Sequence, residues 1–448
     1  MSLFDQFPCG GSAHLQRRSF LKATALTGGA SWLTTVAERL AHADEQAPRG
    51  QQPMSLIVLW LGGGPSQLET FDPHFNADVA DGKPGIGGQV KAIKTIAPGV
   101  EIGAGLPRLA EQMDKVALIR SVTSKEGDHE RATYNMKNGY RMDPTLIHPS
   151  LGAILSHQTT DKVEIPRHIS IIPNQWPGRG GYLGAEYDAF KTFDPQGPIP
   201  DVVSQVDPTR AQRRQVDLNV VEDAFARRRR KQLEAGKTLH RASIEAARRM
   251  MESEHLTAFD VKQAPQALRD EFGNSAFGRS CLAALRLIEV GVRCVEVTLD
   301  GFDSHINNLE VQQARMADLD PAFAALLKNL QERRLLDRTL VVCAGEFGRT
   351  PRVNPLQGRD HWPHGFSIAL AGANIVGGKV VGETAAQPVL DEKDRLKDVA
   401  DQRPVEDVHA TILTALGLDP KKELQTPINR PLSLSPVNGK IIPEIFAT

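Results

Sequence analysis

The sequence predicts an α/β protein with a doubly wound, mainly parallel sheet flanked by helices. Six short apolar runs predict buried strands, at residues 55–61, 116–121, 168–172, 292–299, 339–344 and 366–372. Their hydrophobicity is continuous rather than alternating, which is typical of strands covered on both faces. Apolar residues at helical spacing predict helices over 278–291 and 320–336, between the last strands. Such alternation of helix and strand favours a parallel sheet.

The first 43 residues have the three regions of a twin-arginine export signal. Arg17 and Arg18 precede a mildly apolar stretch at 23–37, and residues 41–43, Ala-His-Ala, supply a small-x-small cleavage site. An ordinary amphipathic first helix is the alternative interpretation. The signal predicts export by the twin-arginine translocase, a periplasmic or secreted protein, and a single mature domain over 44–448.

The composition of the chain excludes several classes of protein. Its 448 residues are 40% hydrophobic and 24% charged, which indicates a globular protein rather than a disordered chain. The net charge of −1 gives no reason to expect nucleic acid as a partner. Beyond the signal, no apolar run approaches the ~18 residues of a spanning helix, so we expect no stable membrane span. Cys281, Cys294 and Cys343 have apolar neighbours and are expected to be buried thiols.

A helical insertion is predicted at about 209–257, where the sequence is polar and basic and nearly free of Pro and Gly. Val216, Val220 and Ala224 keep helical spacing, which predicts packing on one side. The basic run at 226–232 could contact an anionic polymer or a lipid surface, or could form a solvated helix face.

Polar clusters follow several predicted strands, and ligands of open α/β sheets bind beyond the carboxyl ends of strands. After the first strand, Ser66 either caps a helix together with Glu69 or contacts substrate. After the second, Asp128 and His129 stand near a predicted helix start. Asp128 there either caps the helix or belongs to a site at its N-terminus.

The densest clusters follow the later strands. Asp300, Asp303 and His305 occur close together, and the Asp-x-His pair shares one face if the backbone is extended. A surface turn is the alternative for Asp300. The run "GRDHWPHGF" at 358–366 adds two His with a spacing of three residues around a Pro, which excludes the zinc-peptidase helix motif.

Carboxylates and imidazoles gathered from several strand ends suit one or two divalent ions, such as zinc, manganese, calcium or magnesium. The candidate metal ligands are Asp128, His129, Asp303, His305, Glu346, Asp360, His361 and His364. Arg349 and Arg359 are candidates for holding an anionic group by its oxygens, with Ser66 as a third substrate-binding residue.

Several blocks of the sequence resemble an exported bacterial family, domain of unknown function 1501. They include "LWLGGGPSQLETFDP", "TLVVCAGEFGRTP", "GRDHWPHGFSIALAGANIVGGKVVGET" and "DVHATILTALGLD". That family is placed in the alkaline phosphatase and sulfatase superfamily. The resemblance implies a doubly wound α/β sheet and a site that holds one or two metals.

Within this resemblance, Asp303 and His305 are similar to the superfamily's Asp and His after a late strand, where the usual spacing is Asp-x-x-x-His. Glu346 and Phe347 stand where that superfamily has a strand-ending Asp-His pair. His361 or His364 would supply the last His.

Two positions depart from the superfamily's pattern. Gly62 to Gly64 stand where a phosphatase-like enzyme supplies a metal-binding Asp, and His129 stands roughly where a Ser, Thr or modified Cys nucleophile is expected. His129 therefore either binds metal or attacks directly.

The resemblance and the clusters together predict an exported metal-dependent hydrolase of a phosphate or sulfate ester. Its substrate would be a small anionic ester or a sulfated or phosphorylated polymer, with His129 and Arg349 as catalytic residues. The alternative is an exported binding or scaffold protein that retains the fold without turnover.

Overall fold

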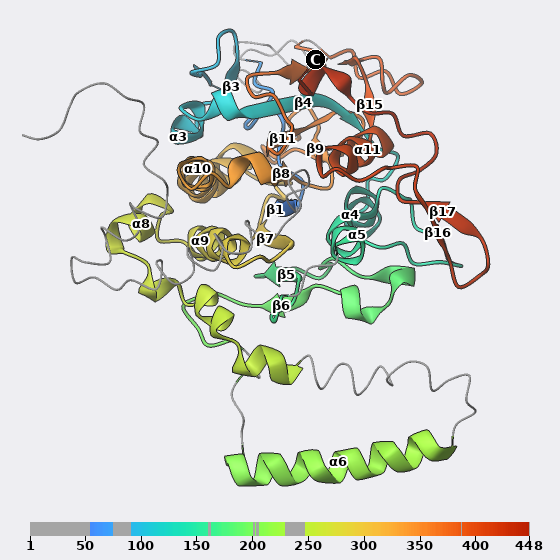
Figure 1. The fold of residues 1–448 in the computed structure, drawn as a ribbon. Coiled ribbons are helices and arrows are strands. Elements are labelled where there is room, and N and C mark those ends of the chain that lie inside the picture. Colours follow the sequence, from blue (N-terminus) through green and yellow to red (C-terminus); the bar gives the residue numbers. More distant parts are fainter. Residues whose placement is uncertain are drawn as a thin grey trace, which may run out of the picture. The chain divides into compact units, whose positions relative to one another are not determined.

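A mixed sheet of nine strands lies at the centre of this computed structural model, within the residues that are described (Figure 1). Those residues are 54–74, 91–159, 163–199, 202, 206–228, 247–386 and 388–447. In sheet order the strands are β12 (Val380–Val381), β4 (Val116–Thr123), β11 (Phe366–Gly372), β8 (Thr339–Ala344), β1 (Ser55–Gly62), β7 (Cys294–Asp300), β5 (His168–Ile171) and β6 (Phe190–Thr192), with β15 (Arg403–Pro404) on β4.

The predicted mainly parallel sheet is confirmed, and all six predicted strands form within two residues of their expected bounds. Only β11 runs against its neighbours in the described sheet, antiparallel to both β4 and β8. This reversal matters for the site, because the N-terminus of β11 thereby reaches the edge where β4, β8, β1 and β7 end. The segment that precedes β11 is therefore brought to the same edge as the loops that follow those four strands.

Helices cover both faces of the sheet, as the continuous hydrophobicity of the strands predicts. Figure 1 shows α9 and α10 on one side and α4, α5 and α11 on the other. The described α-helices are α3 (Pro107–Ala110), α4 (His129–Asn138), α5 (Leu151–Gln158), α6 (Pro208–Arg228), α8 (Gln266–Glu271), α9 (Ala276–Glu289), α10 (Asn308–Glu332) and α11 (Val405–Ala415).

Short elements complete the described fold. Four two-stranded ladders pair β2 (Ala92–Lys94) with β3 (Glu101–Gly103), β9 (Gly348–Arg349) with β10 (His361–Trp362), β13 (Glu383–Thr384) with β14 (Val399–Ala400), and β16 (Glu423–Gln425) with β17 (Pro431–Ser433). The 3₁₀ turns are η1 (Met113–Lys115), η2 (Gly181–Leu183), η3 (Ala185–Tyr187), η5 (Glu254–Phe259), η6 (Val261–Gln263), η7 (Leu336–Arg338) and η8 (Pro443–Ile445).

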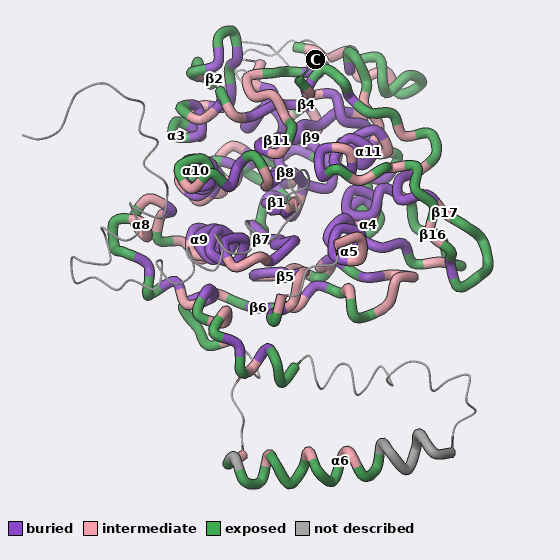
Figure 2. The backbone as a smooth tube through the Cα atoms, in the orientation of Figure 1, coloured by how far each residue is buried: buried purple, intermediate pink, exposed green. Residues whose placement is uncertain are grey.

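Alternate residues of β1 enter two different apolar cores. Ile57 and Leu59 pack with the α9 and α10 layer, whereas Val58 and Trp60 pack with the α5 and α11 layer. Figure 2 shows the central strands as largely buried, and every residue of β1 is buried. Successive side chains of a strand point to opposite faces, so the odd-numbered and the even-numbered side chains of β1 must both be apolar. The strand ends at Gly62, which lies opposite Asp300 in the parallel ladder.

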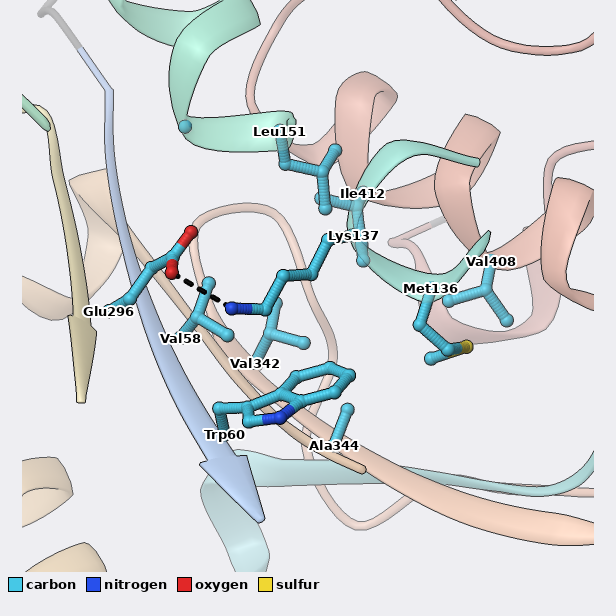
Figure 3. Close-up of a pocket in the computed structure, with 11 residues that line it drawn as sticks. Val58, Trp60, Met136, Lys137, Leu151, Glu296, Val342, Ala344, Val408 and Ile412 are labelled. Atoms are coloured by element: carbon cyan, nitrogen blue, oxygen red, sulfur yellow. Dashed lines mark hydrogen bonds and ion pairs between the residues drawn. The ribbon is translucent and has the colours of Figure 1, made fainter. Parts of the chain in front are cut away.

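A buried ion pair joins α4 to β7 beneath the apolar side chains of α5 and α11 (Figure 3). Lys137 Nζ lies 3.0 Å from Glu296 Oε2 and 5.0 Å from the centroid of the Trp60 ring. The same ammonium group donates to the Trp176 carbonyl at 2.8 Å. The pair thus connects the helix that begins at His129 with the strand that leads to Asp303.

The helix predicted to begin at residue 320 is longer than expected, because α10 already begins at Asn308 and continues through Pro321. Pro321 removes one backbone donor, yet the apolar residues on both sides of it are buried against the core. Asp320 accepts from the backbone amides of Arg108 and Leu109 at the start of α3, which ties the middle of α10 to a neighbouring turn. Tertiary packing therefore outweighs the local preference of Pro for a helix start.

The segment predicted as an insertion contains α6 (Pro208–Arg228) among its described residues. Its expected packing is not found, because Val216 and Val220 are 57% and 62% exposed. The basic run at 226–232 extends into residues 229–246, which lie outside the described residues, and the export signal at 1–43 lies outside them as well. Within the described residues, no helix combines the length and the apolar character that crossing a membrane requires.

Candidate metal centre

Three histidines and one carboxylate meet at the edge where β4, β7 and β8 end. His129 begins α4 after β4, Asp303 and His305 lie in the loop after β7, and His361 lies in β10, just before the reversed strand β11. The β9–β10 ladder pairs His361 with Arg349, which follows β8. Three segments that are far apart in the sequence therefore supply one cluster.

The three imidazoles direct the same ring atom toward Asp303. His305 Nε2 lies 3.2 Å and His361 Nε2 3.3 Å from Asp303 Oδ1, and His129 Nε2 lies 3.5 Å from Asp303 Oδ2. The Nε2 atoms of His305 and His361 are only 3.1 Å apart.

The opposite ring nitrogen of each histidine is held by an acceptor. His305 Nδ1 donates to Asp360 Oδ1, and His129 Nδ1 donates to Glu346 Oε1, both at 2.8 Å. A backbone carbonyl takes the third role, since His361 Nδ1 donates to Gly127 O at 2.8 Å. An N–H that donates at Nδ1 leaves the Nε2 lone pair of a neutral imidazole free, which is how proteins orient histidine ligands of metals.

This donor set fits a divalent transition metal. With the ring proton on each Nδ1, the Nε2 lone pairs face one another and the Asp303 carboxylate, an arrangement that a cation satisfies. Ligands at ~2.0–2.1 Å around a tetrahedral ion lie about 3.4 Å from one another, close to the separations described above. His129, Asp303 and His361 can each offer a ligand atom with all of these atoms within 4.8 Å of one another. Imidazole with carboxylate suits zinc or a similar ion.

Charged neighbours shift the pKa of two of these groups in opposite directions. The hydrogen bond to Glu346 raises the pKa of His129, although burial of the ring opposes this effect. Burial favours the neutral form of Asp303, but the hydrogen bond and charge of Arg349 outweigh it and lower the pKa of this carboxyl. Asp303 therefore stays ionised at neutral pH, as a metal ligand must be.

The Arg349 side chain is fully buried and engaged by protein atoms. Its Nη2 donates to Asp303 Oδ1 at 2.5 Å, its Nε donates to Gly64 O at 2.9 Å, and its Nη1 donates to Arg359 O at 3.0 Å. Nη2 also donates to the carbonyl of Gly63. The guanidinium predicted to contact substrate thus fixes Asp303 and the turn after β1.

The sequence of residues 53–446 matches the family described as protein of unknown function (DUF1501). The chain belongs to this family. A comparison with curated proteins found no match.

Solved structures of the alkaline phosphatase superfamily are similar to this DUF1501 chain. A superfamily member from Vibrio parahaemolyticus is 8% identical, with 82% of this chain and 67% of that chain covered and a TM-score of 0.35. The PsFucS1 sulfatase from Pseudoalteromonas sp. is 12% identical, with coverages of 86% and 71% and a TM-score of 0.37. The alkaline phosphatase from the Antarctic bacterium TAB5 is 14% identical, with coverages of 72% and 93% and a TM-score of 0.30.

Two predicted substrate-binding residues of the DUF1501 chain lie behind the cluster. Ser66 is buried, and its amide donates to Gln312 Oε1 at 3.1 Å. Arg359 forms a buried ion pair with Glu69 at 3.2 Å. Glu69 is therefore a partner of Arg359 rather than of a helix start, and neither Ser66 nor Arg359 is brought to the three histidines.

Two predicted ligands point elsewhere. Asp128 is the N-cap of α4 and accepts from the Arg131 amide at 3.1 Å. The His364 ring faces Arg395, with Nε2 3.5 Å from a guanidinium nitrogen, and burial lowers the pKa of this imidazole. Glu346 and Asp360, also predicted as ligands, hold histidine rings in place.

The cluster also contains groups to which the sequence assigned no role at the site. The buried Phe347 ring packs against His129 and His361, with centroids 5.0 and 4.4 Å away. The Gly63 amide donates to Glu346 Oε1 at 2.9 Å. Gly63 has φ +104°, and a Cβ there would lie 2.5 Å from the Asp303 amide nitrogen, so glycine is required at this position. In the sequence, the run of three glycines at 62–64 is the feature that indicates a close approach of two backbone segments.

Proposed function

We propose that this DUF1501 chain is a metal-dependent hydrolase of a phosphate or sulfate ester. The observation that carries the proposal is the convergence of three Nε2 atoms on Asp303, with every Nδ1 held by a separate acceptor. A divalent ion bound there would polarise the ester and offset the negative charge that develops on its oxygens.

The residues of the chain would hold and orient the reacting groups. Arg349 keeps Asp303 in place, and Asp360, Glu346 and the Gly127 carbonyl keep the three rings in one tautomer. The side chains of Asp303 and His305 remain 46% and 44% exposed, so a substrate can approach the cluster from solvent. Phe347 closes the opposite side of the His129 and His361 rings.

Between the two roles open to His129, we assign that of a metal ligand. Its Nδ1 is fixed by Glu346 and its Nε2 faces Asp303, so the lone pair that would attack an ester is the one directed at the ion. Arg349 is assigned to positioning Asp303, because its donors are engaged by the protein. The substrate is a small anionic ester or a sulfated or phosphorylated polymer.

We also propose export by the twin-arginine translocase, on the strength of Arg17 and Arg18 and the small residues at 41–43. A protein exported in the folded state could bind its metal before it leaves the cytoplasm.

Elemental analysis of the purified chain tests the metal centre. We expect one or two equivalents of a divalent metal in the wild type, loss of metal in His361→Ala, and retention in the matched control His364→Ala. The metal-loaded wild type is then assayed with 4-nitrophenyl phosphate, bis(4-nitrophenyl) phosphate and 4-nitrophenyl sulfate. Stoichiometric metal without turnover of any ester would favour the alternative, a non-catalytic binding or scaffold protein.

A further inference from the structure

Asp300 is a carboxylate beside the cluster that the assigned roles do not use. It is the last residue of β7 and is exposed, whereas Glu346, Asp303 and Asp360 are each engaged with a histidine or an arginine. Within the described residues, Asp300 forms no hydrogen bond or ion pair of its own. Asp300 Oδ1 lies beside Gly62, and the amide of the next residue, Gly63, donates to Glu346 Oε1 at 2.9 Å, which places the carboxylate at the border of the cluster.

The end of β1 leaves room for this carboxylate. Gly62 is the ladder partner of Asp300, and a Cβ on Gly62 would lie 2.0 Å from Asp300 Oδ1. The carboxylate thus lies in space that a side chain at position 62 would occupy. The same hypothetical Cβ would lie 3.3 Å from Asn174 Nδ2, so the loop after β5 borders this space.

The usual covalent nucleophiles are not available at the described cluster. Ser66 is buried away from it, Ser304 Oγ donates to Asn308 Oδ1 at 2.6 Å, and all three described cysteines are buried. The Nε2 lone pair of His129 faces the metal position. With these side chains excluded, water is the remaining candidate for the nucleophile. A water molecule that attacks the ester needs a group that accepts its proton.

We propose that Asp300 is the general base of a single displacement in which water attacks the ester directly. This inference rests on the proposed function. The water oxygen forms a bond to phosphorus or sulfur while its proton passes to an Asp300 carboxylate oxygen. The bond to the leaving oxygen breaks with its electron pair, and the leaving group takes a proton from solvent or from Asp300. No covalent bond to the chain is formed.

The environment of Asp300 suits this role. Partial burial and the nearby Glu346 carboxylate raise the pKa of Asp300, and the proximity of His129 limits the rise. A carboxylate with a raised pKa accepts a proton more readily than an ordinary one.

The test compares Asp300→Ala and Asp300→Asn with Asp337→Asn, an exposed carboxylate in η7 at the opposite end of β8. With the substrate that the wild type hydrolyses best, we expect kcat to fall about a hundredfold or more in both Asp300 variants. Metal content and Tm should stay at the wild-type values, and Asp337→Asn should behave as wild type. Added formate, a small carboxylate, should restore part of the activity of Asp300→Ala.

Gly62→Ala supplies a second variant, since its methyl group would displace the Asp300 carboxylate without removing any ligand. We expect a lower kcat at unchanged metal content. Alkali-quenched wild type should carry no phosphoryl or sulfuryl adduct by mass spectrometry, and added ethanolamine should receive none of the transferred group.

Three results would overturn the inference: full activity in Asp300→Asn, loss of a metal equivalent in that variant, or an adduct on the chain. A metal-loaded wild type that hydrolyses none of the esters would instead overturn the proposed function, and this inference with it.

Discussion

Arg349 Nη2 and Asp303 Oδ1 are 2.5 Å apart, and the arginine is fully buried whereas the aspartate is 46% exposed. A buried cation thus holds the carboxylate on which the three histidines converge, and that carboxylate remains open to solvent. The guanidinium can do so because backbone carbonyls on two sides fix its plane.

Arg349→Lys should therefore weaken metal binding. Lysine keeps the charge but lacks the planar array of donors that contacts Gly63, Gly64 and Arg359, so Asp303 loses its fixed position. We expect zinc affinity to fall about 10- to 100-fold, the usual effect of removing an outer partner of a metal ligand. A chelator competition titration measures it. Arg395→Lys, which changes the partner of His364, is the control, and equal losses in both variants would contradict the assigned role.

Lys137→Met should lower the free energy of unfolding, by less than the ~3–5 kcal/mol that a fully unpaired buried charge costs. The Glu296 carboxylate keeps a second partner, because His168 Nε2 lies 3.3 Å from Glu296 Oε1 and the pKa of this imidazole is raised to about 10 despite its burial. Lys137 and Glu296 are 7% and 4% exposed, so solvent screens this pair little. Urea unfolding measures the loss. The double variant Lys137→Met, His168→Gln removes both cationic partners of Glu296 and should be less stable than Lys137→Met. Equal stability of the two variants would argue against a charge effect.

His409 should make the fold sensitive to acid. The ring is buried on α11 with neither nitrogen paired, and burial lowers its pKa to about 3. In the unfolded chain the pKa is about 6.5, so the stabilisation is full above that pH and is lost as the pH falls toward 3. Between pH 7.5 and pH 5, the wild type should lose about 2 kcal/mol more than His409→Leu. Parallel pH dependences of the two proteins in urea unfolding would refute the prediction.

Replacement of Arg17 and Arg18 by lysine should abolish export while leaving the mature chain unchanged. Cell fractionation with antibody detection distinguishes a retained precursor from the processed protein. A matched replacement of Lys22 by arginine should leave export intact. Processed protein in the periplasm despite the double lysine replacement would show that the signal uses another route.

The sequence was most informative about the sheet, because strands buried on both faces must be apolar at every position. The runs at 339–344 and 366–372 therefore gave the bounds of β8 and β11 without error. The direction of β11 could not be derived, since apolar runs carry no sign of parallel or antiparallel pairing. That direction explains why His361 joins groups that follow other strands.

Residue type and position indicated which segments form the cluster, but not what each side chain contacts. Arg349 and Arg359 are chemically suited to an anion, yet burial and nearby carbonyls and carboxylates engage them inside the protein. Asp128 accepts a hydrogen bond from an amide of α4 and thus caps the helix. Its position after a strand fits a cap and a metal ligand equally well, so the sequence could not distinguish the two roles. His361 and His364 are indistinguishable by composition, and only the β9–β10 ladder separates them.

The Gly127 carbonyl and the His361 ring that it orients are 234 residues apart in the sequence. No short segment of the chain can therefore bind the ion with the full set of ligands, and loading must follow closure of the loops that bring β4 and β11 together. A bound ion would in turn oppose the separation of these loops and would therefore slow unfolding. An ion at the proposed metal centre would thus prolong the folded state, independently of any reaction at the site.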